Sequence, residues 1–246
     1  TYVPQDACLF SCDFFGSHLA TTDLFVRNED RVYEAAKRYY AEIMMPFRRI
    51  ITRNLEKLGN YDIEVIAPSH GPVYDKPAFI LDAYADWVSS QAKNEVVLPY
   101  VSMHGSTDLM VEHLVNALAM RGVTVYPFDL TVTDIGELAI RLVDAASLVV
   151  ATPTFHVGAH PAVYYAAHLA NLLKPKLKYA AMISSYGWGS KAFEQLTELI
   201  PNLKVDVLGT LLHKGLPTEE TYRELNDLAD KIAAAHEGDE GVITAH

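Results

Sequence analysis

The feature that most constrains the fold is a strict alternation of short β-rich runs and longer helical runs from Glu95 onward. The β-rich runs are Val96–Ser102, Thr124–Asp129, Ser147–Ala151, Tyr179–Ile183 and Val205–Leu211. Helical periodicity marks the segments that follow them: Asp108–Arg121, Ile135–Val143, Pro161–Leu173, Lys191–Leu199 and Thr218–Ala235. Such alternation predicts a parallel sheet with crossover helices on both of its faces.

Five strands and five helices over about 150 residues predict a doubly wound α/β sandwich of the flavodoxin-like type, with strand order 2-1-3-4-5. The nearly continuous apolar runs Leu148–Ala151 and Ala180–Ile183 are typical of central strands buried on both faces. Right-handed crossovers then put a ligand crevice at the carboxyl ends of the strands.

The first 95 residues have a different pattern. Their predicted elements are, in order, a strand at Ala7–Ser11, a long helix at Arg31–Leu58, a strand at Ile63–Ala67 and a helix at Ala78–Ser90. Two strands and two helices do not close a sheet, so this segment is predicted to be part of a domain. The polar stretch Ser89–Asn94 is the expected boundary, which gives domains at residues 1–94 and 95–246.

Composition excludes several classes of function. The net charge of -11, without a basic stripe, argues against nucleic acid as a partner. No uncharged run reaches the roughly 18 residues that cross a bilayer, and the N-terminus does not resemble a signal peptide, so a soluble cytoplasmic protein is expected. The first residue, Thr1, suggests a chain that begins partway through a larger protein. Cys8 and Cys12 are expected to be small, buried apolar residues.

A polar loop follows the first strand of the alternating region and opens the next helix; it consists of Ser102, Met103, His104, Gly105, Ser106 and Thr107. The first amides of a helix lack intrahelical acceptors, and the helix dipole favours an anion there. We therefore expect this loop to bind a phosphate group. Serine and threonine are also favoured at helix N-termini without any ligand, so the loop taken alone leaves both interpretations open.

Two more loops follow the third and fourth strands. The first contains Thr152, Pro153, Thr154, Phe155, His156, Val157 and Gly158. The second contains Ser184, Ser185, Tyr186, Gly187, Trp188 and Gly189. In a 2-1-3-4-5 sheet both are neighbours of the phosphate loop. We expect His156 and His160 at the mouth of the resulting pocket.

The convergence of three loops favours flavin mononucleotide (FMN) as the ligand. A flat tricyclic ring needs aromatic faces, such as those of Tyr186 and Trp188, and backbone donors along its pyrimidine edge. Glycines such as Gly187 let the backbone come close. The two aromatic residues could instead simply cover the core, and Pro153 could simply end a strand. Three such coincidences at one place favour a cofactor site.

The segments Ser102–Thr107, Thr152–Pro161 and above all Ser184–Gly189 resemble the three FMN loops of the flavodiiron proteins, or A-type flavoproteins. In that family a diiron domain of the metallo-β-lactamase fold, an αββα sandwich, precedes a flavodoxin-like domain. The resemblance implies that residues 1–94 are the C-terminal part of the first domain and residues 95–246 the second. Two departures are visible: His104 stands where relatives often carry Trp, and His156-Val157 stands where two Asn residues are common.

Two motifs in the first 95 residues, Leu9–Gly16 and Ile66–Pro72, resemble the later metal-ligand motifs of that family. By that resemblance Asp13 would be the carboxylate that bridges two irons, and His70 a terminal imidazole ligand. A carboxylate has two oxygens and can span two cations, and neutral imidazole suits iron. Without the family, an Asp before a turn and a His before Gly-Pro are also common structural choices.

The remaining ligands of that site have no counterpart in this chain. The family's first cluster, His-x-Glu-x-Asp on an earlier loop, and a further histidine are missing. The required spacing is not supplied by His18, His104, His113, His156, His160 or His168. We expect His113 and His168 to be helix residues without a site. Either the preceding half is on another chain or was lost, or this chain is a fragment without iron chemistry.

The resemblance implies an oxidoreductase in which FMN passes electrons to a non-haem diiron site (two Fe) that reduces O2 to water or NO to N2O. It also implies a homodimer or homotetramer, and rubredoxin, NADH through a reductase, or reduced deazaflavin F420 as the electron donor. The alternative is a flavodoxin-type electron carrier without catalytic iron. A hydrolase of the metallo-β-lactamase type is disfavoured, because the flavin domain would have no role.

Overall fold

The structure, a computed structural model, describes residues 1–244 of the 246-residue chain. The chain divides into two compact units, one spanning Thr1–Ser89 and the other beginning at Ser90. The polar stretch Ser89–Asn94 contains this division, although its second half already belongs to a strand, β4 (Ala92–Tyr100). No helix of the described residues is both long enough and apolar enough to cross a bilayer.

The second unit is built on a parallel sheet with the order β5-β4-β6-β8-β9. Besides β4, its strands are β5 (Thr124–Asp129), β6 (Ala145–Phe155), β8 (Tyr179–Tyr186) and β9 (Asp206–Lys214). Numbered along the chain, this order is 2-1-3-4-5, so the flavodoxin-like fold predicted from the sequence is confirmed. A short strand that was not predicted, β10 (Val242–Ile243), pairs in parallel with the first residues of β4.

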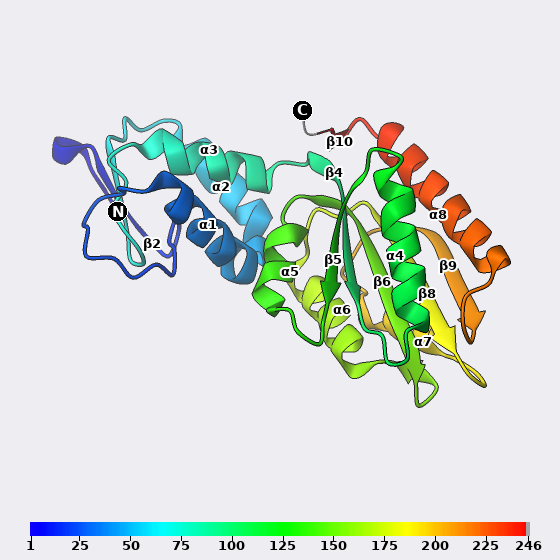
Figure 1. Cartoon of the computed structure of the whole chain (residues 1–246). Helices are drawn as coiled ribbons and strands as arrows, with labels where there is room; N and C mark the ends of the chain where they lie inside the picture. Colours follow the sequence, from blue (N-terminus) through cyan, green and yellow to red (C-terminus); the bar gives the residue numbers. More distant parts are fainter. Residues whose placement is uncertain (245–246) are drawn as a thin grey trace. The chain divides into compact units, whose positions relative to one another are not determined.

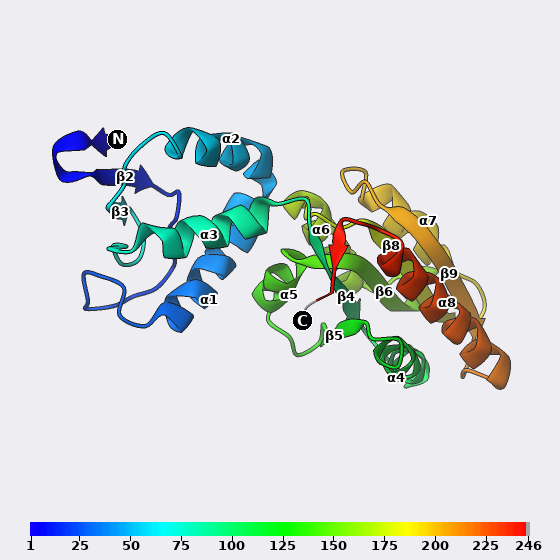
Figure 2. The ribbon, with the colours of Figure 1, turned by 90° about the horizontal axis from the view of Figure 1, so that it is seen from above.

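Five helices cover the two faces of this sheet: α4 (Ser106–Ala119), α5 (Ile135–Leu142), α6 (Pro161–Leu173), α7 (Ala192–Leu199) and α8 (Glu219–Glu237). Helices α4 and α8 lie along one face, and α5, α6 and α7 along the other (Figures 1 and 2). Under α4 and α8 lies an apolar core that includes Leu98, Met110, Leu114, Leu225 and Ile232. Strand β6 is buried from Ala145 to Pro153, as expected for a central strand.

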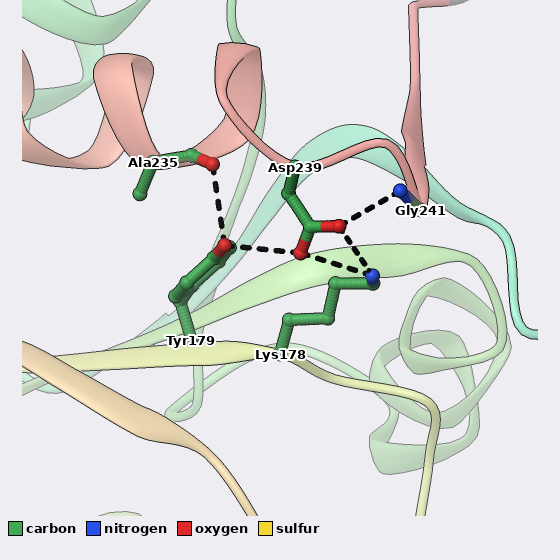
Figure 3. Close-up of polar contacts among 5 residues, drawn as sticks. All are labelled: Lys178, Tyr179, Ala235, Asp239 and Gly241. Carbon is green, nitrogen blue, oxygen red and sulfur yellow. Dashed lines mark hydrogen bonds and ion pairs between the residues drawn. The ribbon is translucent and has the colours of Figure 1, made fainter.

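A polar cluster fastens the segment after α8 to the start of β8 (Figure 3). The carboxylate of Asp239 accepts hydrogen bonds from Lys178 Nζ at 2.8 and 2.9 Å and from the amide of Gly241 at 2.8 Å. The hydroxyl of Tyr179 lies 3.0 Å from the same carboxylate. The hydrogen bond from Lys178 and that from Gly241 hold the pKa of Asp239 below its ordinary value. The cluster therefore holds β10 where it can pair with β4.

A buried histidine lies at the end of α8, next to this cluster. One ring nitrogen of His236 is 2.5 Å from Ser147 Oγ and the other is 2.8 Å from Asn94 Oδ1. The ring also stacks on Tyr179, at 5.7 Å between centroids. Burial lowers the pKa of His236 to about 4, an effect that the nearby charge of Asp239 only partly opposes. The imidazole is therefore neutral in the folded chain at neutral pH.

The first unit contains a three-stranded sheet with the order β1-β2-β3. Strand β1 (Tyr2–Val3) is antiparallel to β2 (Cys8–Cys12), and β2 is parallel to β3 (Val65–Pro68). The α-helices of the unit are α1 (Glu29–Tyr39), α2 (Arg48–Leu58) and α3 (Pro77–Val88). Its core is aromatic: the largest fully buried side chains are Trp87, Tyr40, Tyr74, Tyr84 and Phe15. Edge-to-face and tilted contacts among these rings pack the unit around α3.

Two expectations for this unit are wrong. The helix predicted at Arg31–Leu58 is interrupted: α1 is followed by a π-turn at Tyr40–Met44 and a 3-10 turn at Met45–Phe47 before α2 begins. Pro46 lies at the interruption, where it lacks the amide hydrogen that a continuous helix requires. The cysteines are not both buried, because β2 buries only Leu9: Cys8 is half-buried and Cys12 is exposed.

We expect the free energy of unfolding to fall as the pH is lowered through the titration range of His236. Its folded pKa of about 4 lies below the ordinary value of about 6.5, so between these values only the unfolded chain takes up the proton. Stability is therefore complete above about pH 6.5 and lost toward pH 4. Between about pH 7.5 and 5 the loss should be roughly 1–2 kcal/mol, measured by urea unfolding.

The variant His236→Gln keeps a hydrogen-bonding side chain that does not titrate, so its stability should depend less on pH by that amount. As a matched control, His168→Gln changes an exposed histidine of α6 and should retain the pH dependence of the unchanged chain. If the free energy of unfolding depended on pH equally in all three proteins, His236 would take up its proton as readily in the folded chain as in the unfolded chain.

Candidate functional site

The carboxyl ends of β4, β6 and β8 open onto one cavity of about 460 Å³. All three loops singled out from the sequence contribute to its lining. The first loop supplies Met103, His104, Ser106 and Thr107; the second supplies Pro153, Thr154, Phe155 and His156; the third supplies Ser185, Tyr186, Gly187 and Trp188. Strand register accounts for the convergence, because Tyr100 of β4 pairs with Ala151 of β6, and Pro153 of β6 with Ser185 of β8.

The first amides of α4 form the polar end of this cavity. Gly105, with φ of +85°, turns the chain into the helix. The hydroxyl of Ser102 accepts hydrogen bonds from the amides of Gly105 at 3.2 Å and Asp108 at 3.3 Å. Among residues 1–244, no protein acceptor lies within hydrogen-bonding reach of the amides of Ser106 and Thr107. Two donors at the positive end of the helix dipole are therefore available to an anion.

Buried hydroxyl groups connect the loops beneath the cavity. The hydroxyl of Thr107 lies 3.0 Å from that of Ser185, and Thr107 is only 1% exposed, so the first and third loops are joined directly. Thr154 donates to Ser190 Oγ at 2.8 Å, which joins the second loop to the segment before α7. These bonds hold the loops in position without a ligand, which reduces the ordering cost of binding one.

Part of the cavity lining is aromatic and open. Trp188 is 85% exposed, an unusual exposure for an indole, and Phe155 and Tyr186 also line the cavity. A β-carbon added at Gly187 would meet no protein atom within 4 Å, and Gly187 does not have a positive φ. Neither packing nor backbone conformation therefore requires glycine there. Its absent side chain leaves the main chain accessible to a flat ligand.

Seven of the predicted site residues do not line this cavity: Ser102, Gly105, Thr152, Val157, Gly158, Ser184 and Gly189. Thr152 and Ser184 are fully buried beneath it, and Gly158 packs against the side chain of Gln195. Conversely, Gly215 lines the cavity and was not predicted. It directly follows β9, which ends at Lys214. The strand predicted from the sequence ended at Leu211, so the glycine that ends the strand was not recognised as part of the site.

The turn at the tip of β6 carries backbone strain. His156 and Val157 have φ of +47° and +72°, and they connect β6 to β7 (Gly158–Ala159) as a two-residue hairpin. Such turns favour Asn and Gly, because a β-branched residue is unfavourable in the left-handed region. The amide of Lys191 donates to the carbonyl of Val157 at 2.6 Å and so holds the turn.

Of the two histidines expected at the mouth, His156 lines the cavity and His160 does not. His160 Nδ1 instead accepts a hydrogen bond from the amide of Ala162 at 3.2 Å and caps α6, while partial burial lowers the pKa of its ring. His113 and His168 lie on helices, as expected, and neither lines this cavity.

The two candidate metal ligands lie side by side in the first unit. Asp13 follows β2 and His70 follows β3, and the parallel pairing of Cys12 with Pro68 brings these ends together. Their nearest atoms, Asp13 Oδ1 and His70 Nε2, are 3.3 Å apart. The side chain of Asp13 is 65% exposed and that of His70 is 46% exposed. Burial and the charge of Asp13 raise the pKa of Tyr39, which packs against His70. His18, given no role from its spacing, lies 5.7 Å from His70 between ring centroids.

This pair does not by itself make a metal site. Among residues 1–244, no group of three or more His, Cys, Asp or Glu side chains is arranged to hold a metal ion. A diiron centre needs several further ligands, since each iron prefers a shell of nitrogen and oxygen donors. The described residues therefore fit FMN but not a diiron centre.

Comparison with known proteins identifies the class. Residues 1–71 match the family model described as ODP family beta lactamase. The nitric oxide reductase of Moorella thermoacetica is 35% identical over 245 residues, covering 95% of this chain and 60% of the relative. The anaerobic nitric oxide reductase flavorubredoxin of Escherichia coli is 28% identical, covering 95% and 50% respectively. The chain thus spans only about half to three-fifths of the length of these relatives.

Solved structures give the same result. The rubredoxin oxygen:oxidoreductase of Desulfovibrio gigas matches with a TM-score of 0.90 and 26% identity, over 95% of this chain and 60% of that one. The flavodiiron protein of Giardia intestinalis matches with a TM-score of 0.86 and 26% identity, over the same shares. The fold class is therefore a flavodoxin-like sheet preceded by part of a lactamase-like domain. More particularly, the resemblance to the flavodiiron family is confirmed along 95% of the chain.

We expect Val157→Gly to raise the free energy of unfolding by about 1 kcal/mol. Glycine adopts a positive φ without steric cost, and this gain should exceed the extra backbone entropy of the unfolded chain. The matched control is Val132→Gly, at a position that is 83% exposed and has no positive φ, which should lower stability by roughly 0.5–1 kcal/mol. If urea unfolding showed that both variants lower the free energy of unfolding by the same amount, the turn would not be strained.

Proposed function

We propose that this chain is the flavin-binding portion of a flavodiiron oxidoreductase, and that its ligand is FMN. The observation that carries the proposal is the cavity onto which all three loops open, whose lining includes residues with free helix amides and an exposed indole. A monophosphate suits the first feature and a flat ring the second. The fold and the relatives support the same assignment.

In this proposal the residues of the cavity bind and orient the cofactor. The amides of Ser106 and Thr107 hold the phosphate, and Ser102 fixes the loop that presents them. Tyr186 and Trp188 stack on the ring, and the main chain at Gly187 approaches its polar edge. Bound FMN supplies one- and two-electron transfer, and the protein contributes position and electrostatic environment.

We propose that the complete protein reduces nitric oxide, dioxygen or both. Relatives of this chain are named as a nitric oxide reductase and as a rubredoxin oxygen:oxidoreductase, and these names support both substrates equally. Asp13 and His70 would be two ligands of a diiron centre whose other ligands come from outside the described residues. Rubredoxin, NADH through a reductase, and reduced deazaflavin F420 remain the proposed electron donors.

We also propose that the cavity faces another protein surface. Three large apolar side chains that line the cavity are exposed, namely Met103, Phe155 and Trp188. Nearby in the chain, Leu109, Val157 and Leu216 are exposed as well. FMN would cover only those that line the cavity. An exposed apolar rim around a cofactor supports contact with an electron donor or with a second copy of the chain in a homodimer or homotetramer.

The test is to titrate the purified chain with FMN and with riboflavin, which lacks the phosphate. FMN should bind at least about tenfold more tightly, since only FMN can use the helix amides. The variant Ser102→Ala should reduce the affinity for FMN and leave that for riboflavin nearly unchanged. Trp188→Ala should weaken both ligands to a similar degree, because stacking involves the ring alone.

The result would contradict the proposal if neither flavin bound, or if riboflavin bound as tightly as FMN. In the first case the cavity would have another ligand. In the second case a flavin would bind without the phosphate contacts that distinguish this cavity from a generic aromatic pocket.

A second candidate function is an FMN electron carrier without catalytic iron, which the incomplete ligand set of Asp13 and His70 favours. Iron analysis of the complete assembly, isolated from cells, distinguishes the two. About two irons per flavin would support the oxidoreductase. Flavin without iron would support the carrier, with the first unit acting as a docking or dimerisation surface.

A further inference from the structure

The loop between β9 and α8 is a fourth loop that contributes to the lining of the flavin cavity. Gly215 lines the cavity together with Tyr186 and Gly187 of the third loop. The amide of Gly215 donates to the carbonyl of Tyr186 at 3.0 Å, so the position of this loop and that of the third loop are coupled. With φ of +78°, Gly215 turns the chain away from β9 toward α8.

One histidine holds this loop through hydrogen bonds at both of its ring nitrogens. His213, the penultimate residue of β9, has Nε2 at 2.8 Å from the carbonyl oxygen of Leu216 and Nδ1 at 3.0 Å from the hydroxyl of Thr221. Leu216 follows Gly215 directly, and Thr221 belongs to the first turn of α8. The ring thus ties the turn that carries Gly215 to the helix behind it.

The chemistry of the two partners assigns the tautomer. A carbonyl oxygen only accepts hydrogen bonds, so Nε2 must carry the proton that it donates to Leu216. Nδ1 of the neutral ring then accepts from the hydroxyl of Thr221. The hydroxyl of Thr221 can donate its hydrogen to Nδ1, because its oxygen acts as the acceptor in the hydrogen bond from the amide of Thr218, in the capping box of α8. Each side of the ring therefore has a distinct role: Nε2 holds the loop, and Nδ1 is anchored to the helix.

We propose that His213 is a positioning residue for the flavin cavity, which acts by donating its Nε2 proton to Leu216 and so holds Gly215 against the bound cofactor. The proposal rests on the function proposed above and names a residue that touches neither the ring nor the phosphate. Without this bond the loop would keep the hydrogen bond from Gly215 to Tyr186. It would lose the link that runs from Leu216 through the ring of His213 to Thr221 of α8. Binding FMN would then have to order the turn.

The experiment compares two isosteric variants of the full chain by FMN titration. In His213→Gln the side-chain amide nitrogen lies near the former Nε2 and can still donate to Leu216. In His213→Asn the polar atoms lie near the former Nδ1, so the bond to Thr221 is kept and the bond to Leu216 is lost. We expect His213→Asn to bind FMN roughly five- to tenfold more weakly, and His213→Gln to bind within about threefold of the unchanged chain.

A third variant separates positioning from stability. Thr221→Val removes the partner of Nδ1 and part of the capping box, so it should lower the unfolding temperature and leave FMN affinity within about threefold of the unchanged chain. A purely structural role for His213 would make affinity follow unfolding temperature across the three variants. In addition, the ¹⁵N spectrum of the His213 ring should show the proton on Nε2 at neutral pH.

The proposal would be overturned by equal affinities in both His213 variants, whether both are weak or both are unchanged, or by a ring protonated on Nδ1 alone. The outcomes also separate it from the proposed function. If the unchanged chain binds FMN and the two variants do not differ, only the role of His213 fails. If the unchanged chain does not bind FMN, the assignment of the cavity fails, and the role of His213 fails with it.

Discussion

The parallel pairing of β4 with β6 and of β6 with β8 determines the rest of the second unit. Each strand contributes a loop at its carboxyl end, and hydrogen bonding between the strands fixes how far each loop projects. Because Pro153 pairs with Ser185, the second and third loops leave the sheet at the same level. A slip of one residue in this register would turn the buried side chains of β6 to the other face. The cavity is therefore a consequence of the sheet.

Buried hydroxyl groups then fix the positions of the loops around this crevice. Thr107 and Ser185 are buried and joined to each other, so they position the first and third loops and do not serve mainly as ligand contacts. The groups left for a ligand include main-chain amides at the start of α4 and the aromatic faces of Phe155, Tyr186 and Trp188. This arrangement suits a cofactor that must be held in a fixed orientation while its electron count changes.

In the first unit, parallel strand pairing also brings two loops together, but their side chains do not form a complete site. The parallel pairing of β2 with β3 brings Asp13 and His70 within 3.3 Å, as it would in a complete metal site. Two ligands on two adjacent strand ends can occupy only one side of a metal centre. Both side chains remain partly exposed, Asp13 to 65% and His70 to 46%. This geometry is compatible with the proposal that Asp13 and His70 are two ligands of a larger metal site.

The sequence by itself determined the alternation of strands and helices, the strand order, and the identity of the loops that meet at the cavity. These follow from local periodicity and from the handedness of crossovers, both of which are visible in short segments. Asp13 and His70 were indicated by the resemblance of their motifs to the flavodiiron family, since an Asp before a turn and a His before Gly-Pro are also common structural choices. The errors of the sequence-based predictions were local as well: Pro46 divides a helix that periodicity alone extended, and Cys12 lies on a strand with one open face.

Only the tertiary structure decided which residues of those loops face the cavity and which support it from behind. Ser102, Thr152 and Ser184 are polar residues in the correct loops, yet their hydroxyls bond to the protein, because burial obliges polar groups to find partners nearby. The contributions of Gly215 and His213 depend on the hydrogen bond from Gly215 to Tyr186 and on the contacts of His213 with Leu216 and Thr221. The predicted strand order places β9 beside β8 but does not specify these contacts, so the part that Gly215 takes in the cavity lining became visible only in the folded chain.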